Sequence, residues 1–142
     1  MTRIVPDHIW AAMTIWAEAR GEIWEGQIAV GEVIRNRTDQ KFSSDGSVAS
    51  TILWPYQLSC WNTKDPNRAK MAMLMFDNKM FNQCLRAWND CMAGTEFTKG
   101  ALFYCNLDAV SENPSWIAHS VQTVKIGQHR FYKPKDEITG KG

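Results

Sequence analysis

The sequence predicts a mainly helical α+β fold in which several helices pack with one small antiparallel sheet. A run of residues from His8 to Ala17 contains no Lys, Arg, Asp or Glu. Apolar residues repeat at helical spacing from Phe81 to Met92, and two strand-like segments meet at Gly127. The length of 142 residues suits one domain. We expect a core over about 7–133 and a loose, charged tail over 134–142.

The first helix is predicted to start at an N-cap, Asp7, and to end at a left-handed Gly21. A helix so poor in charge should be buried. Glu18 lies in its last turn, where burial and the negative end of the helix dipole both favour a neutral carboxyl. Glu18 could therefore act as a general acid, the group that protonates a glycosidic oxygen. The alternative is a surface glutamate near a frayed helix end. Glu22 and Glu25 are expected in a solvated turn, and either could serve as a second carboxylate.

A second helix is predicted over 26–38, with Arg37 on an apolar face. A buried arginine needs a carboxylate or several carbonyls, so Arg37 is either a structural clamp or a cation of the site. Ser47 should cap a short helix that closes before Pro55. The segment 55–62 has neither helical nor strand periodicity, and its aromatic and hydrogen-bonding side chains suit a ligand-binding loop.

Asp65 and Pro66 are expected to start a helix that runs to about Phe76. The helix with apolar residues over 81–92 should end at Gly94. A short strand is predicted over 101–105. A hairpin is predicted from segments 121–126 and 129–133, joined by a two-residue turn with Gly127 first.

The composition narrows the class of partner. The 16 basic and 15 acidic residues nearly cancel, which argues against nucleic acid and favours a neutral polymer or a small molecule. Seven Trp residues could stack on sugar rings, although most of them could equally belong to the core. The three histidines and four cysteines show no zinc-type spacing. We therefore expect free thiols, no metal and no cofactor.

The N-terminus lacks the features of a secretory signal, and the apolar run is too short to span a bilayer. The chain is therefore expected to be made in the cytoplasm, without stable membrane insertion.

Several separated motifs, in the same order, resemble those of the SleB-like cell-wall hydrolases, a family of spore-cortex-lytic enzymes and phage lysis proteins. The resemblance covers about residues 7–133. The matching segments are 17–22, 25–30, 33–37, 55–62, 100–101, 104–106, 114–116 and 126–132.

This resemblance implies a lysozyme-like, lytic-transglycosylase-like fold that cleaves the β-1,4 bond between N-acetylmuramic acid and N-acetylglucosamine. The family's catalytic glutamate falls on Glu18. In the transglycosylase scheme one carboxyl acts first as acid and then as base, and the muramoyl 6-hydroxyl attacks to leave a 1,6-anhydro end. A muramidase that uses water is the other outcome. Many relatives carry histidines near the strand at Phe103 and Cys105, and this chain has neither.

Residue type and motif position suggest further substrate contacts. Hydrogen bonds to the sugars are expected from Gln57, Ser59 and Asn106. Stacking walls are expected from Tyr56, Trp61 and Tyr104. Glu22 and Arg37 are secondary candidates.

The expected partners are peptidoglycan glycan strands, bound by a monomer. The predicted setting is phage or prophage lysis, with holin-mediated release to the periplasm; a virion-associated muramidase is also open. Two other functions remain as alternatives. One is a non-catalytic peptidoglycan-binding module. The other is a peptidoglycan amidase or peptidase, for which Cys60 is the one loop cysteine that could be a nucleophile.

Overall fold

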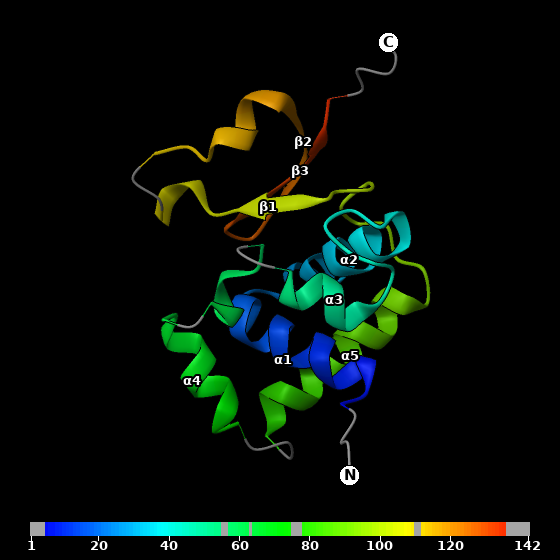
Figure 1. Cartoon of the computed structure of the whole chain (residues 1–142), viewed down its shortest axis with the longest axis vertical. Helices are drawn as coiled ribbons and strands as arrows, with labels where there is room; N and C mark the ends of the chain where they lie inside the picture. Colours follow the sequence, from blue (N-terminus) through cyan, green and yellow to red (C-terminus); the bar gives the residue numbers. More distant parts are fainter. Residues whose placement is uncertain (1–4, 55–56, 63, 75–77, 110–111, 136–142) are drawn as a thin grey trace.

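The computed structural model describes residues 5–54, 57–62, 64–74, 78–109 and 112–135. The helices form one body and the sheet lies on one side of it (Figure 1). The described α-helices are α1 (Asp7–Ala19), α2 (Trp24–Gln40), α3 (Val48–Leu53), α4 (Pro66–Ala72) and α5 (Lys79–Met92). The described 3-10 turns are η1 (Ser59–Trp61), η2 (Leu107–Ala109) and η3 (Ser115–His119), and the strands are β1 (Phe103–Cys105), β2 (Ser120–Ile126) and β3 (His129–Pro134).

The first helix, α1, is the centre of the helical body, as its uncharged sequence predicts. It packs against α2, α3, α4, α5 and η1. Ala11, Ala12 and Ile15 are fully buried. The predicted mainly helical α+β fold is therefore confirmed. The burial of α1 has the reason that the sequence analysis gave, because an apolar helix is stable only when other elements cover it.

Both ends of α1 differ from the prediction. Pro6, not Asp7, occupies the N-cap, and its carbonyl accepts the N–H groups of Ile9 and Trp10 at 3.0 and 3.2 Å. At the other end Arg20 is the C-cap with a φ of −62°, so no left-handed Gly21 is needed. The Arg20 guanidinium instead donates to the carbonyls of Trp16 and Ala17, at 3.2 and 3.3 Å, and satisfies the open end of the helix.

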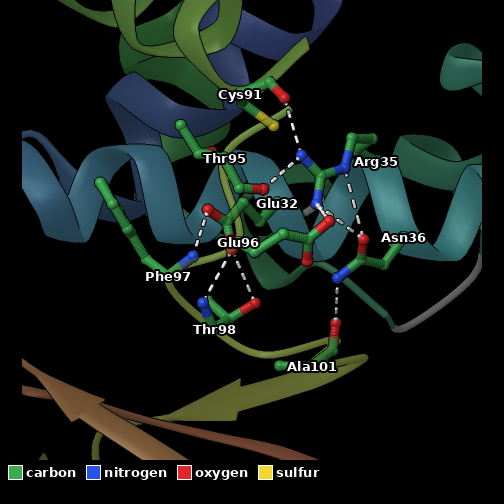
Figure 2. A network of polar contacts seen from close by, with 9 residues as sticks. All are labelled: Glu32, Arg35, Asn36, Cys91, Thr95, Glu96, Phe97, Thr98 and Ala101. Carbon is green, nitrogen blue, oxygen red and sulfur yellow. Dashed lines mark hydrogen bonds and ion pairs between the residues drawn. The ribbon is translucent and has the colours of Figure 1, made fainter. Parts of the chain in front are cut away.

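The second helix, α2, is buried from Gly26 to Arg37 although it carries several polar side chains. Figure 2 shows how they are satisfied. Glu32 accepts the N–H groups of Phe97 and Thr98 at 2.9 and 2.8 Å. Asn36 donates to the Ala101 carbonyl at 2.9 Å. Because buried polar groups are costly when unpaired, these bonds fasten the segment that leads into β1 along α2.

Two caps agree with the sequence and one helix end does not. The side chain of Ser47 accepts the Ser50 N–H at 3.2 Å, and Asp65 accepts the Asn67 N–H at 2.8 Å. The helix α4 ends at Ala72, short of the predicted Phe76. Tight bonds from the N–H groups of residues 73 and 74 to carbonyls three residues earlier close it, and residues 75–77 lie outside the described residues.

The sheet has the antiparallel order β1-β3-β2. The predicted hairpin is confirmed, and Gly127 occupies its turn with a φ of 59°. An irregularity between Gln122 and Val124 shifts the register, as at a β-bulge. Fully buried Phe131 packs with Ala29 and Val33, so β3 rests on α2. β3 also extends to Pro134, one residue past the predicted strand, while residues 136–142 of the predicted tail lie outside the described residues.

Candidate active site

Glu18 lies at the end of α1, half-buried, and both of its carboxyl oxygens accept a hydrogen bond. Oε1 accepts the hydroxyl of Tyr104 from β1. Oε2 accepts the backbone N–H of Cys60 from η1, at 3.2 Å. The donors come from segments 42 and 86 residues away in the chain. The fold therefore holds this carboxyl between the helical body and the sheet.

The turn η1 is attached to α1 one helical turn before Glu18. Trp61 donates its indole N–H to the Thr14 hydroxyl at 2.8 Å, and that hydroxyl donates to the Trp10 carbonyl at 2.9 Å. The rings of Trp61 and Trp10 meet edge to face at 5.3 Å. Cys60, next to Trp61 in η1, is fully buried. These contacts fix the position of the Cys60 N–H that faces Glu18.

Tyr104 reaches Glu18 from the sheet and is supported by β3. Its ring lies 5.0 Å from that of His129 and 5.8 Å from that of Phe131. Burial, and then the negative charge of Glu18, raise the pKa of Tyr104 well above its ordinary value. The phenol therefore keeps its proton, and a hydroxyl can donate to a carboxylate or accept from a carboxylic acid.

Arg37 is 4% exposed and only partly satisfied. Its Nε donates to the Leu102 carbonyl at 2.7 Å, two residues before Tyr104, while Nη1 is buried without a partner. Burial lowers the pKa of Arg37, and the nearby Tyr104 and Glu18 oppose that shift. Arg37 thus clamps the residue before β1 and also places a positive charge near the Glu18 carboxyl.

Glu22 joins the turn after α1 to the hairpin. Its Oε1 accepts the Gln128 N–H at 2.9 Å. A Cβ on Gly127 would stand 2.1 Å from that oxygen, so only glycine fits there without movement. Burial lowers the pKa of His129, and the charges of Glu22 and Glu18 oppose the shift. Glu22 therefore contacts the hairpin turn, whereas Glu25 is exposed, as the expected solvated turn predicts for it.

The other described site candidates differ in their exposure and contacts. Asn106 donates to Gln128 Oε1 at 3.2 Å and accepts the Asp108 N–H at 3.0 Å. Gln57, two residues before η1, and Ser59, its first residue, are exposed, whereas Trp61, its last residue, is half-buried. Tyr56 lies outside the described residues.

Sequence reasoning missed the Cys60 N–H, because a backbone donor has no residue-type signal. It also missed His129, whose position beside Tyr104 follows only from the register of β1 and β3.

The Cys60 thiol is poorly suited to nucleophilic attack. Burial and the charge of Glu18 raise its pKa far above the ordinary value, and only a thiolate is an effective nucleophile. Within the described residues, no group of three His, Cys, Asp or Glu side chains is placed to hold a metal ion. In the same part of the chain, no helix has the length and apolar character needed to cross a membrane.

The family model described as Cell Wall Hydrolase matches residues 21–132. The chain belongs to this family. Within the cell wall hydrolases it is similar to the spore cortex-lytic enzyme of Oceanobacillus iheyensis, with 31% identity over 86% of this chain and 40% of that protein. The enzyme of the same name from Bacillus subtilis is 30% identical over 84% of this chain and 35% of that protein. The chain therefore spans well under half the length of these relatives.

Two solved structures extend the family comparison to the fold. The catalytic domain of the germination-specific lytic transglycosylase SleB from Bacillus anthracis aligns with a TM-score of 0.71 and 30% identity, over 91% of this chain and all of that one. The catalytic domain of the Bacillus cereus SleB protein aligns with a TM-score of 0.70 and 28% identity, over 94% of each chain. The predicted lysozyme-like fold of the SleB type is confirmed.

Proposed function

We propose that this cell wall hydrolase cleaves the β-1,4 bond between N-acetylmuramic acid and N-acetylglucosamine in peptidoglycan, as a lytic transglycosylase with Glu18 as its one acid and base. The observation that carries the proposal is the position of Glu18, held by the Tyr104 hydroxyl and the Cys60 N–H at the junction of helices and sheet. The similarity to SleB catalytic domains supports the same chemistry.

In the first step, Glu18 in its protonated form gives its proton to the glycosidic oxygen as the bond to the leaving sugar breaks. Negative charge then appears on the carboxyl. The Tyr104 hydroxyl and the Cys60 N–H both point at that carboxyl and stabilise the charge without having to reorient.

In the second step, the Glu18 carboxylate removes the proton of the muramoyl 6-hydroxyl, whose oxygen attacks the anomeric carbon. The ring closes to a 1,6-anhydro end and Glu18 is protonated again, ready for the next cycle. This scheme needs no second carboxylate. Glu22 is bonded to the hairpin turn, and we assign it a positioning role.

Arg37 supports the ionised form of Glu18 from inside the protein. Its unpartnered Nη1 is buried, so substrate does not reach that atom, and its charge acts through the buried space around Tyr104. A cation in such surroundings interacts more strongly than one in water. Arg37 therefore acts as a positioning residue. Its positive charge stabilises the negative charge that forms on Glu18 when Glu18 gives its proton to the substrate.

The substrate contacts keep the roles that the sequence suggests. We assign Gln57, Ser59 and Asn106 to hydrogen bonds with the sugars. Tyr56 and Trp61 are assigned to the walls on which the rings lie.

The experiment is a comparison of Glu18→Gln with Glu25→Gln on purified sacculi. Glu25 is exposed in the first turn of α2, so it controls for the loss of one surface carboxyl. We expect Glu18→Gln to lose about a hundredfold to ten-thousandfold in rate while still binding the wall, and Glu25→Gln to keep its rate. Full activity of Glu18→Gln would overturn the assignment.

Mass spectrometry of the products separates the related functions. Anhydro ends support transglycosylation, and reducing muramic acid ends would replace it with hydrolysis by water. Cut stem peptides would instead indicate an amidase or peptidase. Binding without any product would leave a binding module.

The proposed setting is lysis of a phage host. Expression inside bacteria, with and without a holin that opens the inner membrane, tests it. We expect lysis only when the holin is present, and lysis without it would contradict this route to the wall.

A further inference from the structure

A hollow lined by lysines lies between the end of α2, the segment before β1 and the end of β3. Its volume is about 390 Å³, within the range of ligand sites. Lys99, Lys133 and Lys135 line it together with Gln40, Gly100 and Leu102. No feature of the proposed cleavage reaction uses it.

The hollow concentrates positive charge in a chain whose net charge is only +1. Among the described residues, no acidic one lines it. Asp136 and Glu137 follow in the sequence but fall outside the described residues. The ammonium groups of the three lysines have no hydrogen bond or ion pair with a described residue. The one salt bridge among the described residues joins Arg35 and Glu96. These lysines are therefore available to an anionic ligand.

The backbone around Lys99 is fixed before any ligand binds. Lys99 has a φ of 57° and Gly100 a φ of 86°. On one side, Glu32 bonds both the N–H and the hydroxyl of Thr98 at 2.8 Å, and on the other Asn36 bonds the Ala101 carbonyl at 2.9 Å (Figure 2). A held backbone lowers the entropy lost on binding.

The start of β1 links the hollow to the proposed reaction centre. Leu102 lines it, and Tyr104, two residues further along extended chain, contacts Glu18. Two residues of strand span about 7 Å. The Cα atoms of Leu102 and Tyr104 are therefore about 7 Å apart, a separation that an extended peptide of several residues can cover.

We propose that this lysine-lined hollow binds the carboxylates of a peptidoglycan stem peptide. The peptide starts at the lactyl group of muramic acid, and it carries free carboxylates that lysine ammonium groups attract. This inference rests on the proposed function, because it takes the muramic acid next to Glu18 as the starting point. It adds recognition of the peptide to recognition of the sugars.

The test uses Glu18→Gln as the parent, so that the wall is not cut during the measurement. Binding is measured by co-sedimentation with purified peptidoglycan, before and after an amidase has removed the stem peptides. The test variant adds Lys99→Gln, Lys133→Gln and Lys135→Gln. The control variant instead adds Lys79→Gln, Arg86→Gln and Lys125→Gln, which removes the same charge from exposed positions elsewhere.

We expect the parent and the control to bind stem-bearing wall at least about threefold more tightly than stem-free wall at low salt, since each exposed pair adds a modest factor. The test variant should lose that preference, and added salt should reduce it. Equal preference in the test variant and the parent would overturn the proposal.

A competition assay and a thermal melt complete the test. If inorganic phosphate or teichoic acid on the wall competes as well as a free stem peptide, the hollow is a general anion site and the proposal is wrong. The thermal melt shows whether the test variant is folded. Should it be unfolded, the same binding comparison is made with each single lysine variant. Cleavage by the wild type tests the proposed function separately, since Glu18 can fail as the acid while stem-dependent binding persists.

Discussion

At the scale of single residues, Glu18 depends on one side-chain donor and one backbone donor. Only the side chain can be removed by substitution. Tyr104→Phe deletes the hydroxyl and keeps the ring that packs on His129 and Phe131. Because hydrogen bonds to a charged group contribute about 1.5–3 kcal/mol, we expect turnover to fall about tenfold to a hundredfold.

The control is Tyr132→Phe, which changes a phenol that is also buried, on β3, and whose hydroxyl has no hydrogen bond to a described residue. Its rate on sacculi should match the wild type. Equal rates for Tyr104→Phe and Tyr132→Phe would show that the Tyr104 hydroxyl has no part in the reaction.

Two buried arginines of α2 offer a second residue-scale prediction. Arg35 donates to the carbonyls of Cys91 and Thr95, at 2.7 and 2.8 Å, and so holds the fold. Arg37 has a buried nitrogen without a partner. Arg35→Gln should therefore lower the free energy of unfolding by about 2 kcal/mol or more, measured by urea denaturation, with little change in the pH profile of the folded fraction.

Arg37→Gln should instead change the reaction. Without the cation, the negative charge that the reaction places on Glu18 is less favourable, so turnover of the folded variant on sacculi falls. Turnover equal to that of the wild type would reduce Arg37 to its clamp on Leu102.

The sequence predicts part of this site for identifiable reasons. Glu18 stands out because it ends an uncharged run, which is a local feature. The contact with Tyr104 joins residues 86 apart, and it depends on how the sheet docks on α2. The chemistry of Tyr104 as a hydroxyl donor, and not only a stacking ring, therefore becomes visible only in three dimensions.

At the scale of elements, the contact between the hairpin turn and Glu22 explains why Gly127 is glycine. Its φ of 59° disfavours any Cβ, and a Cβ would also collide with Glu22. We expect Gly127→Ala to destabilise the protein by at least about 1–2 kcal/mol. In a Glu22→Ala background the cost should be smaller, because only the backbone penalty is left.

Thermal and urea denaturation of the four proteins of this cycle measure the coupling. Gly21→Ala is the matched control, since Gly21 has open space around its Cβ position and no positive φ. Equal costs of Gly127→Ala in both backgrounds would contradict the contact with Glu22.

The attachment of η1 to α1 gives another prediction. Thr14 is fully buried and its hydroxyl accepts the Trp61 N–H. Thr14→Val keeps the shape and removes the acceptor, which leaves a buried donor unpaired at a cost of about 1–3 kcal/mol. Because η1 also presents the Cys60 N–H to Glu18, we expect lower turnover in the folded variant as well, measured on sacculi below its unfolding temperature. Unchanged stability and turnover would contradict the role of this bond.

Elements with local signals are predicted best. The caps at Ser47 and Asp65 and the turn at Gly127 are set by neighbouring residues, and their prediction is confirmed. The ends of α1 are predicted less well because Arg20, rather than Gly21, satisfies the last carbonyls. A long side chain that folds back on its own helix competes with the local cap preference.

At the scale of the whole molecule, the site is assembled where a helical body and a sheet meet. The periodic spacing of apolar residues in the sequence predicts both the helices and the strands. The sheet docks on the helical body through buried polar residues of α2. Glu32 and Asn36 form hydrogen bonds with the segment that leads into β1. A single sequence shows that those residues are polar, but not which backbone groups they satisfy.

The same junction makes stability depend on pH through His129, which lies at the sheet side next to Tyr104. Burial lowers its pKa below the ordinary value of 6.5, against the opposing charges of Glu22 and Glu18. Between these two pKa values the unfolded chain binds more protons than the folded one. The contribution of His129 to stability is therefore fully present above about pH 6.5, and it is lost as the pH drops toward the lowered pKa.

His129→Gln should remove this contribution, so its melting temperature should fall less than that of the wild type when the pH is lowered from about 7.5 to about 5. His119→Gln, at an exposed histidine, should retain the wild-type slope. A wild-type slope in His129→Gln would mean that protonation of His129 does not account for the pH dependence of stability. The pH dependence would then have to come from the carboxylates, whose proton uptake lies mostly at lower pH.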